Sequence, residues 1–596
     1  MRLKRAITFL LAAALTLSTA ACTKPSLPAD KREMTDVEFA LSSIAGTDEF
    51  GRVTAAGDLK YATKRDVGLF YFLWLGAHGN QVYDVSELEK TSPDDILDPN
   101  SKISPVNKYH FWGKPLYGYY RSEDPWVINR HVELFIAADI DFLVFDVTNG
   151  PTYDNVVKTM LETLEKYRLQ GFKVPKVVFM TNSNSQVAVK HFYEWYYVES
   201  SDHYYPELWY CPSGKPLIIG DIRFFDPGNS ASGHEKDEEM LEFFDLRKAQ
   251  WPDEIVMDDE AFPWISWEYP QYNHNGIMSV SVAQHTSRKM SQGPAGNWGR
   301  AFSFEKQKPF PERLAEGLNI QGQWNTVFKS NESKYDFEHV DTVFVTGWNE
   351  WIAIKKYEGG TPFFVDQYNA EYSRDIEMDA EFYKDSYYMQ LVQNIRRFKY
   401  SAAVEYAHEN VTISGGADDE KWESVRSYLD LKGDAMARNY SGYENAGANK
   451  TVYTDDTNRN DIVDIKVAAD GKYAYFRVEC ADDITAYEEG DETFMNIWLN
   501  PTHGVGFPYV INHTFGKLSE LNSDGSYSVV ADASVTVSGK VMTATVPLKS
   551  IGVKSGSIGF IFKVSDHVDA SDPMNFYIQG DSAPIGRLGY TYGYIK

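Results

Sequence analysis

The alternation of short apolar runs with helical stretches, from Asp66 to about Ser401, constrains the fold of this chain most strongly. The runs are rich in β-branched and aromatic residues and too short for surface helices, which is typical of buried parallel strands. Strands that alternate with helices predict βα units. The predicted strands are 67–74, 115–120, 140–145, 176–180, 217–220, 277–283 and the apolar part of 341–351. About seven strands come close to the eight of a (β/α)8 TIM-type barrel.

Helices are predicted between these strands. Asp124-Pro125 has the form of an N-cap followed by proline at the first helical position, and it predicts a helix that ends near Ala138. Apolar residues then recur at helical spacing at 157, 160, 161 and 164, and again at 388, 391, 392, 395 and 398. Both patterns predict amphipathic helices that cover a sheet.

Polar residues stand where several predicted strands end, and a parallel barrel gathers such residues on its active-site face. The strand at 140–145 ends in Asp146, and that at 277–283 ends in Gln284-His285. The most informative end is Trp348-Asn349-Glu350-Trp351. Two indoles offer flat apolar faces to a sugar ring, and the carboxyl group of Glu350 can carry a proton. The alternative is that Asn349 and Glu350 cap a helix while the two Trp side chains pack in the core.

The pattern changes beyond about Ala402. Short strand candidates follow one another without a helix, separated by Asp-Gly turns, at 465–467, 473–478, 494–499, 541–546 and 558–562. This pattern predicts an all-β antiparallel sandwich. The chain is therefore expected to be multidomain, with a barrel over 66–401 followed by a sandwich over 402–596.

The N-terminus has the features of a targeting segment. Arg2, Lys4 and Arg5 precede an apolar run, and small residues lead to Cys22. Small residues before a Cys resemble the bacterial lipoprotein signal, although Thr19 stands where Leu is commonest. We expect residues 1–22 to be a lipoprotein signal peptide, Cys22 to be lipidated, and 23–65 to form a tether and N-terminal extension. The alternative is ordinary secretion with an incidental Cys.

The composition limits the kinds of molecule that this protein is expected to bind. The net charge of −27 argues against nucleic acid, because phosphate binding needs clustered Lys and Arg. The aromatic share of 15% is high, and aromatic side chains commonly line carbohydrate sites. Cys211 and Cys480 lie in different predicted domains, and no CxxC pair is present, so neither a disulfide framework nor a cysteine metal site is expected.

The stretch 345–351 resembles barrel proteins related to the endo-α-mannosidases of glycoside hydrolase family 99. Other stretches share the resemblance, which covers roughly Asp66 to Phe398: 267–271, 299–302, 319–324, 364–368 and 373–377. In that family a second Glu follows the first after three residues, and the pair supports a route through an anhydro-sugar. Glu350 matches the first Glu, but Ala353 occupies the second place.

The C-terminal part resembles family 9 carbohydrate-binding modules in three stretches: 419–422, 473–478 and 580–587 with Tyr590. The resemblance implies sugar binding through aromatic platforms and leaves room for structural calcium. It assigns neither sugar nor calcium to particular residues, so the residues that would bind a metal stay unknown at this stage. No cofactor is expected to be required for catalysis.

Glycoside hydrolysis needs two carboxyl groups, so Glu350 requires a partner. Asp146 is the first choice, Glu268 the second because Trp267 and Tyr269 flank it, and Glu358 a weaker one from the loop after Glu350. Each has an alternative without a catalytic role: Asp146 as the N-cap of a helix, Glu268 as the ion-pair partner of an Arg such as Arg300, and Glu358 as a solvated surface residue. We expect seven further residues to position or stack on the sugar: Trp74, His78, His285, Arg300, Trp348, Asn349 and Trp351.

The sequence thus predicts a lipid-anchored, monomeric glycoside hydrolase on the outer face of a bacterial cell envelope, acting on a polysaccharide or glycan. The first alternative is a non-catalytic glycan-binding lipoprotein with a degenerate barrel, which Ala353 favours. The second is a protein that assists polysaccharide assembly. Contact with a membrane is expected only through the lipid anchor.

Overall fold

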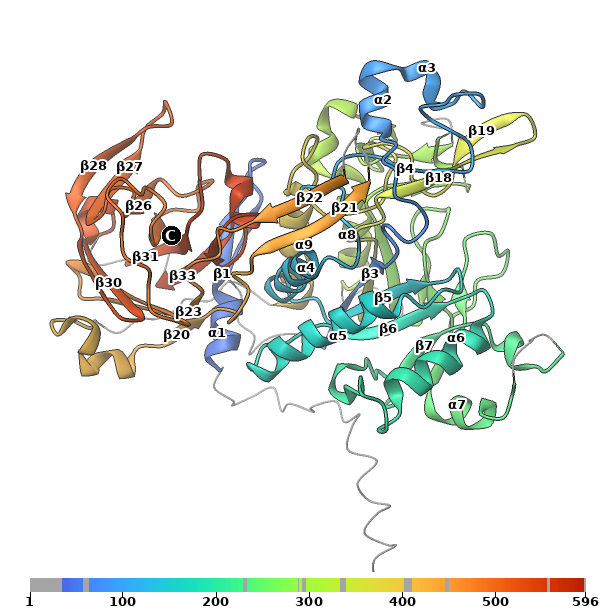
Figure 1. Cartoon of the computed structure of the whole chain (residues 1–596), viewed down its shortest axis with the longest axis horizontal. Coiled ribbons are helices and arrows are strands. Elements are labelled where there is room, and N and C mark those ends of the chain that lie inside the picture. The colour runs from blue at the N-terminus through green and yellow to red at the C-terminus, as the bar shows by residue number, and fades with distance from the viewer. Residues whose placement is uncertain are drawn as a thin grey trace, which may run out of the picture.

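The computed structural model describes residues 35–56, 64–228, 233–287, 289–291, 296–332, 339–400, 410–444, 450–554 and 558–593. These residues form two lobes, one built on a curled parallel sheet and the other on antiparallel sheets (Figure 1). The predicted signal peptide and Cys22 lie outside the described residues. Among the helices that are described, none has the length and apolar character needed to span a bilayer.

The first lobe is organised around a parallel sheet in the order β12-β17-β3-β5-β6-β7-β8, with β11 added antiparallel at the edge of β12. This confirms most of the predicted strands. Their bounds are β3 Asp66–Phe72, β5 Phe142–Val147, β6 Lys176–Thr181, β7 Leu217–Ile219, β8 Asp245–Arg247, β11 Asn273–His274, β12 Ile277–Ser281 and β17 Thr342–Thr346.

The sheet curls towards closure. After Lys248 the chain continues from β8 into β9, Ala249–Gln250, which pairs in parallel with β10, Phe262–Pro263. β10 lies against β12, but no ladder joins these two strands among the described residues. The structure therefore shows a curled parallel half-barrel, and the complete (β/α)8 barrel stays a prediction.

Side chains alternate between the two faces of this sheet. On β5, Phe142 and Val144 join an inner apolar cluster with Phe344 of β17, whereas Leu143 and Phe145 join the larger core beneath the helices. Asp146 continues the inner set, because it stands two residues after Val144. The strand period thus turns this carboxyl group towards the inside of the curl.

Helices cover the outer face, as predicted (Figure 1). The Asp124 carboxylate caps α4 by accepting a hydrogen bond from the Trp126 N–H at 3.0 Å, which confirms the predicted helix start. The helices of this lobe are α2 Val85–Thr91, α3 Pro93–Ile96, α4 Pro125–Ala138, α5 Asp154–Leu169, α6 Ser185–Phe192, α7 Asp237–Phe243, α8 Leu318–Ser330 and α9 Ser386–Lys399.

The prediction of a strand at 115–120 is wrong. This segment forms turns, and Gly118 has a φ of 79°, in the left-handed region that an extended strand excludes. Its aromatic side chains are buried against other parts of the first lobe, such as Trp126 of helix α4, and its backbone bonds to the second lobe through the Tyr119 N–H. The apolar character of the segment did not distinguish a buried loop from a strand of the sheet.

Several short β-sheets lie at the rim of the first lobe. One has the order β19-β18-β4, and its strand β18 begins two residues after Glu350. The remaining strands of this lobe are β4 Tyr109–Phe111, β13 Gln284–His285, β14 Asn297–Trp298, β15 Phe302–Ser303, β16 Lys308–Pro309, β18 Ile352–Glu358 and β19 Thr361–Phe364.

The second lobe contains two antiparallel sheets, as the sequence predicts. One has the order β2-β1-β33-β31-β25-β26-β27-β28 with β32 paired to β31, and the other has the order β20-β23-β24-β30-β29. Phe476 of β24 packs against Phe560 and Phe562 of β31, so the sheets share a core. The strands are β20 Ser427–Leu429, β23 Ile462–Ala469, β24 Tyr473–Cys480, β25 Asn496–Asn500, β26 Tyr509–Ile511, β27 Lys517–Leu521, β28 Tyr527–Asp532, β29 Ser534–Ser538, β30 Val541–Pro547, β31 Gly559–Asp566, β32 Asp581–Ala583 and β33 Gly589–Gly593.

A hairpin from the second lobe reaches across to the first. It consists of β21, Arg438–Glu444, and β22, Lys450–Asp455 (Figure 1). The Gly76 N–H donates to the Tyr443 hydroxyl at 2.6 Å, and the Tyr119 N–H donates to the Tyr453 hydroxyl at 2.7 Å. The hairpin therefore braces the loop that follows β3.

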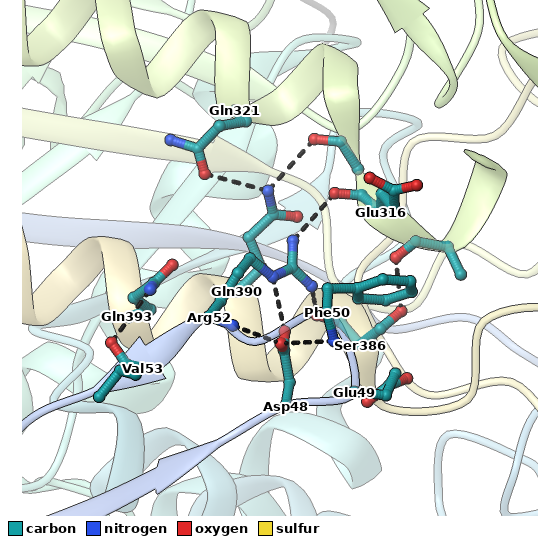
Figure 2. Close-up of polar contacts among 12 residues, drawn as sticks. Asp48, Glu49, Phe50, Arg52, Val53, Glu316, Gln321, Ser386, Gln390 and Gln393 are labelled. Carbon is teal, nitrogen blue, oxygen red and sulfur yellow. Dashed lines mark hydrogen bonds and ion pairs between the residues drawn. The ribbon is translucent and has the colours of Figure 1, made fainter. Parts of the chain in front are cut away.

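Residues 35–56 are not a tether, which corrects the prediction for that part of 23–65. They form helix α1, Asp36–Ser43, and strands β1, Ile44–Thr47, and β2, Val53–Thr54. β1 pairs antiparallel with β33, so this segment belongs to the second lobe. Arg52 then links the lobes: it pairs with Asp48 at 2.5 Å and donates to the backbone carbonyls of Glu316 and Ser386 (Figure 2).

Candidate active site

Glu350 follows β17 on the segment 347–351 and keeps a partly open carboxyl group. Its Oε2 accepts hydrogen bonds from Arg374 Nη2 at 2.8 Å and from Gln367 Nε2 at 3.1 Å. Its Oε1 has no partner among the described residues, and the side chain is 15% exposed. One oxygen is thus fixed by two donors while the other stays available.

Burial raises the pKa of Glu350 well above its usual range. Arg374 opposes this rise, whereas the neighbouring carboxyl groups of Asp375, Asp366 and Asp146 reinforce it. Because Oε2 already accepts two hydrogen bonds, the proton belongs on Oε1. The arrangement therefore suits a carboxyl group that takes up and releases a proton through Oε1.

Asp375 fixes the backbone of Glu350. Its Oδ1 accepts the Glu350 N–H at 2.9 Å, and its Oδ2 accepts from Gln367 Nε2 at 2.8 Å. Burial raises the pKa of Asp375 to about 6. The Gln367 amide donates to both carboxyl groups, so Glu350, Gln367 and Asp375 form one hydrogen-bonded frame.

Asp146 lies where the sequence places it, among the carboxyl groups that influence Glu350. Its Oδ1 accepts from the Thr148 N–H and hydroxyl at 3.1 and 2.8 Å, and its Oδ2 accepts from Trp74 Nε1 at 3.4 Å. The residue is 6% exposed, and burial raises its pKa. Asp146 is therefore close to the site but enclosed by its own partners.

Asp366 is the more accessible acid. Its side chain is 29% exposed, and its Oδ1 lies 3.9 Å from Nε2 of His285. The residue has a φ of 64°, a left-handed conformation that is uncommon outside glycine and found repeatedly at functional sites. His285 itself is buried and donates through Nδ1 to the Ser287 carbonyl, and burial lowers its pKa to about 4.

An aromatic edge borders this group of acids. Trp74 packs edge-on against His78 and Tyr109, with centroid separations of 4.9 and 5.2 Å. His78 is exposed and forms a 3.0 Å hydrogen bond with the Tyr153 hydroxyl. Glu350 raises the pKa of Tyr109 and Asp146 raises that of Tyr153, so both rings lie near the carboxyl groups, although burial is the larger cause in each case.

The expectation that Trp348 stacks on a sugar is wrong. Its side chain is fully buried against Phe135 and His131 of α4, with centroid separations of 4.8 and 5.5 Å. Trp348 therefore belongs to the core between the sheet and its covering helices.

The same holds for Trp351 and Asn349. Trp351 is fully buried, stacks on Trp112 at 4.2 Å and donates through Nε1 to Glu377. Asn349 is also buried, and its side chain bonds to the backbone N–H and C=O of Phe72 at 2.9 and 3.1 Å. These residues hold the segment 347–351 against the end of β3; the core alternative for the Trp pair is the correct one.

Arg300 lies beneath the site instead of within it. Its guanidinium is fully buried, donates to Ser373 and to the Asp375 carbonyl at 2.7 Å, and packs over the Tyr383 and Tyr387 rings. Its predicted contact with sugar hydroxyls is therefore wrong. Arg300 instead supports the backbone of Asp375, which holds Glu350.

Two further candidate acids stand apart from the frame. Glu268 is exposed to solvent and is not enclosed by its aromatic neighbours as expected. Glu358 is exposed at the end of strand β18, not in a loop. Ala353, also on β18, is buried in a small apolar cluster with Val85 and Phe364.

Sequence reasoning overlooked the residues that shape this site most directly: Asp366, Gln367, Arg374 and Asp375. All four lie in the two stretches, 364–368 and 373–377, that carried the family resemblance. The polar residues of these two stretches were visible in the sequence, but no predicted strand ended there, so nothing assigned them to the site. The segment is irregular, and only the fold shows that it closes over the end of β17.

A hollow whose lining includes none of these residues lies elsewhere. A cavity of about 640 Å³ is bordered by Arg52, Gln321, Gln393 and Arg397, among others. None of its described lining residues carries a carboxyl group. We therefore do not assign the chemistry of Glu350 to this cavity.

Among solved structures, the chain is similar to the GH99 endo-α-mannosidase from Bacteroides thetaiotaomicron in complex with bis-tris propane, with 13% identity and a TM-score of 0.31. A second structure of that enzyme gives 13% identity and a TM-score of 0.32. Both matches cover 56% of this chain and 98% of the other. No family model and no curated protein matches the sequence. Function is therefore argued below from the site alone.

Proposed function

We propose that the protein is a glycoside hydrolase that cleaves an O-glycosidic bond of an extracellular polysaccharide or glycan. The observation that carries this proposal is the state of Glu350, a carboxyl group whose pKa is raised by burial, whose Oε2 is held by two donors and whose Oε1 has no partner among the described residues. A protonated carboxyl group in such a place is what a leaving sugar oxygen requires.

In the proposed reaction, Glu350 Oε1 gives its proton to the glycosidic oxygen as the bond to the anomeric carbon breaks. Asp366, the more exposed acid, takes a proton from the water that attacks that carbon. Asp146 is the alternative base, and its contacts with Thr148 and Trp74 favour a positioning role. The rings of Tyr109 and Tyr153 supply the apolar faces that the sequence assigned to Trp348 and Trp351.

The second lobe fits the role of a sugar-binding module, and the N-terminal segment fits a lipid anchor at Cys22. In this proposal the enzyme is held on the outer face of the bacterial envelope and acts as a monomer. These parts of the proposal rest on the sequence resemblances and on the sandwich fold of the second lobe.

Screening purified protein against a panel of polysaccharides and glycans tests the proposal. We expect Glu350→Gln to lower kcat by about 10²–10⁴-fold, the usual contribution of general acid catalysis. Asp366→Asn should lower kcat more than Asp146→Asn does, and Glu358→Gln is the matched control because that side chain is exposed and remote from Glu350.

The rival function is glycan binding without turnover. Ala353 favours it, because the position three residues after Glu350 carries no acid. Binding of a glycan by wild type and Glu350→Gln alike, with no product from either, would support the binding protein and reject the hydrolase.

A further inference from the structure

A buried histidine beside the site has a ring nitrogen without a partner. His285 ends strand β13, and the Trp264 and Trp267 rings pack edge-on against it with centroid separations of 6.2 and 6.3 Å. Its Nδ1 donates to the Ser287 carbonyl, which can only accept, so in the neutral ring Nε2 carries a lone pair. Nε2 is buried and has no partner among the described residues. A buried polar atom left unpaired is rare and calls for an explanation.

The Asp366 carboxyl group lies next to this nitrogen. Its Oδ1 is 3.9 Å from Nε2 of His285, about 1 Å beyond the length of a hydrogen bond. An ionised carboxylate and an imidazole lone pair both accept, so no hydrogen atom joins them. A proton on Oδ1 changes this relation, because a carboxylic acid donates. The neutral form of Asp366 can therefore bond to Nε2, whereas the ionised form cannot.

Backbone pairing brings the two side chains together. Lys289 and Val365 form an antiparallel bridge, and the Phe364 N–H donates to Ser291 Oγ at 3.1 Å. The segment that follows the histidine therefore runs beside the segment that leads to Asp366. The imidazole is 1% exposed and the carboxyl group is 29% exposed, so solvent reaches the carboxyl group but hardly reaches the ring.

The charges around the pair keep the ring neutral. The described charged side chains near it are Arg374, Glu350, Asp146 and Lys289. Burial is the largest cause that lowers the pKa of His285 to about 4; Arg374 lowers it too, and Asp366 opposes both. The Lys289 ammonium group lies over the Phe363 ring at 4.8 Å. At neutral pH the histidine is therefore uncharged, and Nε2 remains an acceptor.

Asp146 has the opposite surroundings. The Thr148 N–H and hydroxyl and Trp74 Nε1 all donate to its carboxyl group. Donors stabilise the ionised form of a carboxyl group, whereas an acceptor beside it stabilises the protonated form. A general base ends its step protonated. Of the two acids, Asp366 is therefore the one whose surroundings suit the product of that step.

We propose that His285 is a positioning residue that accepts a hydrogen bond from Asp366 once Asp366 has taken up a proton. This inference rests on the proposed function, in which Asp366 is the base. As the attacking water bonds to the anomeric carbon, one of its O–H bonds breaks and the proton goes to Asp366 Oδ1, while the leaving oxygen takes the proton of Glu350. The new Oδ1–H group then turns to Nε2, and the charge of His285 does not change. Solvent removes the proton from Asp366 and returns one to Glu350 before the next turnover.

Kinetics with a glycan that the wild type hydrolyses test the role of His285. His285→Leu should lower kcat about 2- to 12-fold, the usual contribution of one hydrogen bond, with KM nearly unchanged. The limb of the pH–rate profile where activity rises with pH should move to lower pH, because the protonated form of Asp366 loses its acceptor. His285→Gln, whose Oε1 can accept in place of Nε2, should restore most of the rate and the position of the limb.

His274→Leu is the matched control. His274 is also buried and also bonds to a backbone carbonyl through Nδ1, that of Asp258 at 2.7 Å, but it lies on the edge strand β11. Its loss should leave kcat and the pH–rate profile unchanged. A higher KM with unchanged kcat in His285→Leu would mean that His285 contacts the sugar. A lower kcat without movement of the limb would make it a packing residue. Either result overturns the proposal.

Nitrogen NMR of protein with isotope-labelled histidine tests the pair without a substrate. The Nε2 resonance of His285, assigned by its loss in His285→Gln, should be that of a free lone pair in wild type at neutral pH. Asp366→Asn should shift it upfield, because the Asn amide donates as the protonated acid would, and Asp366→Leu should not. Equal resonances in all three proteins would overturn the inference. A wild type that hydrolyses no glycan would instead reject the proposed function, whatever the resonances show.

Discussion

At the scale of single residues, the site depends on how Arg374 holds Glu350. The Arg374 guanidinium lies over the Trp264 ring at 4.6 Å and donates to Oε2 of Glu350, while Nε and Nη1 find no partner among the described residues. Arg374 lowers the pKa of Glu350, but burial of that carboxyl group raises it by more. The balance favours the protonated form of Glu350, while Arg374 fixes the orientation of its carboxyl group.

Replacing Arg374 by Met tests this balance. Loss of the positive charge should raise the pKa of Glu350 further, so the limb of the pH–rate profile where activity falls with rising pH should move to higher pH. The maximal rate should fall about 10- to 100-fold because the carboxyl group loses its fixed orientation. Arg397→Met is the control, since Arg397 is exposed and packs over Phe328. An unmoved limb would contradict a direct effect on Glu350.

Replacing Trp351 tests whether its side chain is part of the core or a sugar-binding surface. Trp351→Phe should lower the free energy of unfolding by about 1–3 kcal/mol, because it disturbs the stack on Trp112 and leaves the Glu377 carboxylate one donor short. Urea denaturation measures this, with the half-exposed Trp195→Phe as control. If stability were unchanged and glycan affinity fell, Trp351 would be a sugar platform after all.

The sequence placed Glu350, Asp146, Trp74 and His78 at or just after strand ends, because strand ends are readable from apolar runs, and the structure brings these residues near one another. It did not separate a Trp at the surface from a Trp in the core: both are apolar residues beside a strand end, and only the packing of α4 and Trp112 decides. Asp366, Gln367, Arg374 and Asp375 were not assigned to the site, since they lie on irregular segments whose path depends on tertiary contacts.

At the scale of elements, the hairpin β21–β22 anchors the loop that follows Trp74 at the edge of the site. It extends from the second lobe and holds Gly76, two residues after Trp74, through the Tyr443 hydroxyl. The strands of the parallel sheet were predictable because each is a buried apolar run. The hairpin was not, since its pairing partners and its contacts with the other lobe leave no periodic trace in the sequence.

Tyr443→Phe should lower the free energy of unfolding by about 1–3 kcal/mol, because the buried Gly76 N–H loses its acceptor. Faster hydrogen exchange in the loop after β3 should accompany the loss. Tyr440→Phe on the same strand is the control, because no described residue forms a hydrogen bond with the Tyr440 hydroxyl. Equal exchange in both variants would show that the hairpin does not brace the loop.

At the scale of the whole molecule, three buried acids of the second lobe make stability depend on pH. The pKa values of Asp430, Asp434 and Asp581 are raised in the folded state. The folded protein therefore binds more protons than the unfolded chain. Their stabilising effect is complete below the unfolded pKa of about 4 and is lost as pH rises through the folded values.

The free energy of unfolding should thus fall as pH rises from about 4 through neutrality. Urea titrations across this pH range measure the fall. Asp434→Asn should flatten the profile, because one titrating group is removed. A wild-type profile that is no steeper than that of Asp434→Asn would contradict the assignment of raised pKa values.

The pairing of β1 with β33 sets Ile44 opposite Tyr590, so two of the strands farthest apart along the chain are neighbours in one sheet. Any dissection that starts at the first barrel strand removes that neighbour and leaves a bare row of backbone donors and acceptors, which invites association with another copy. A soluble sandwich fragment would need residues 35–56 supplied as a separate peptide or fused behind the last strand by circular permutation.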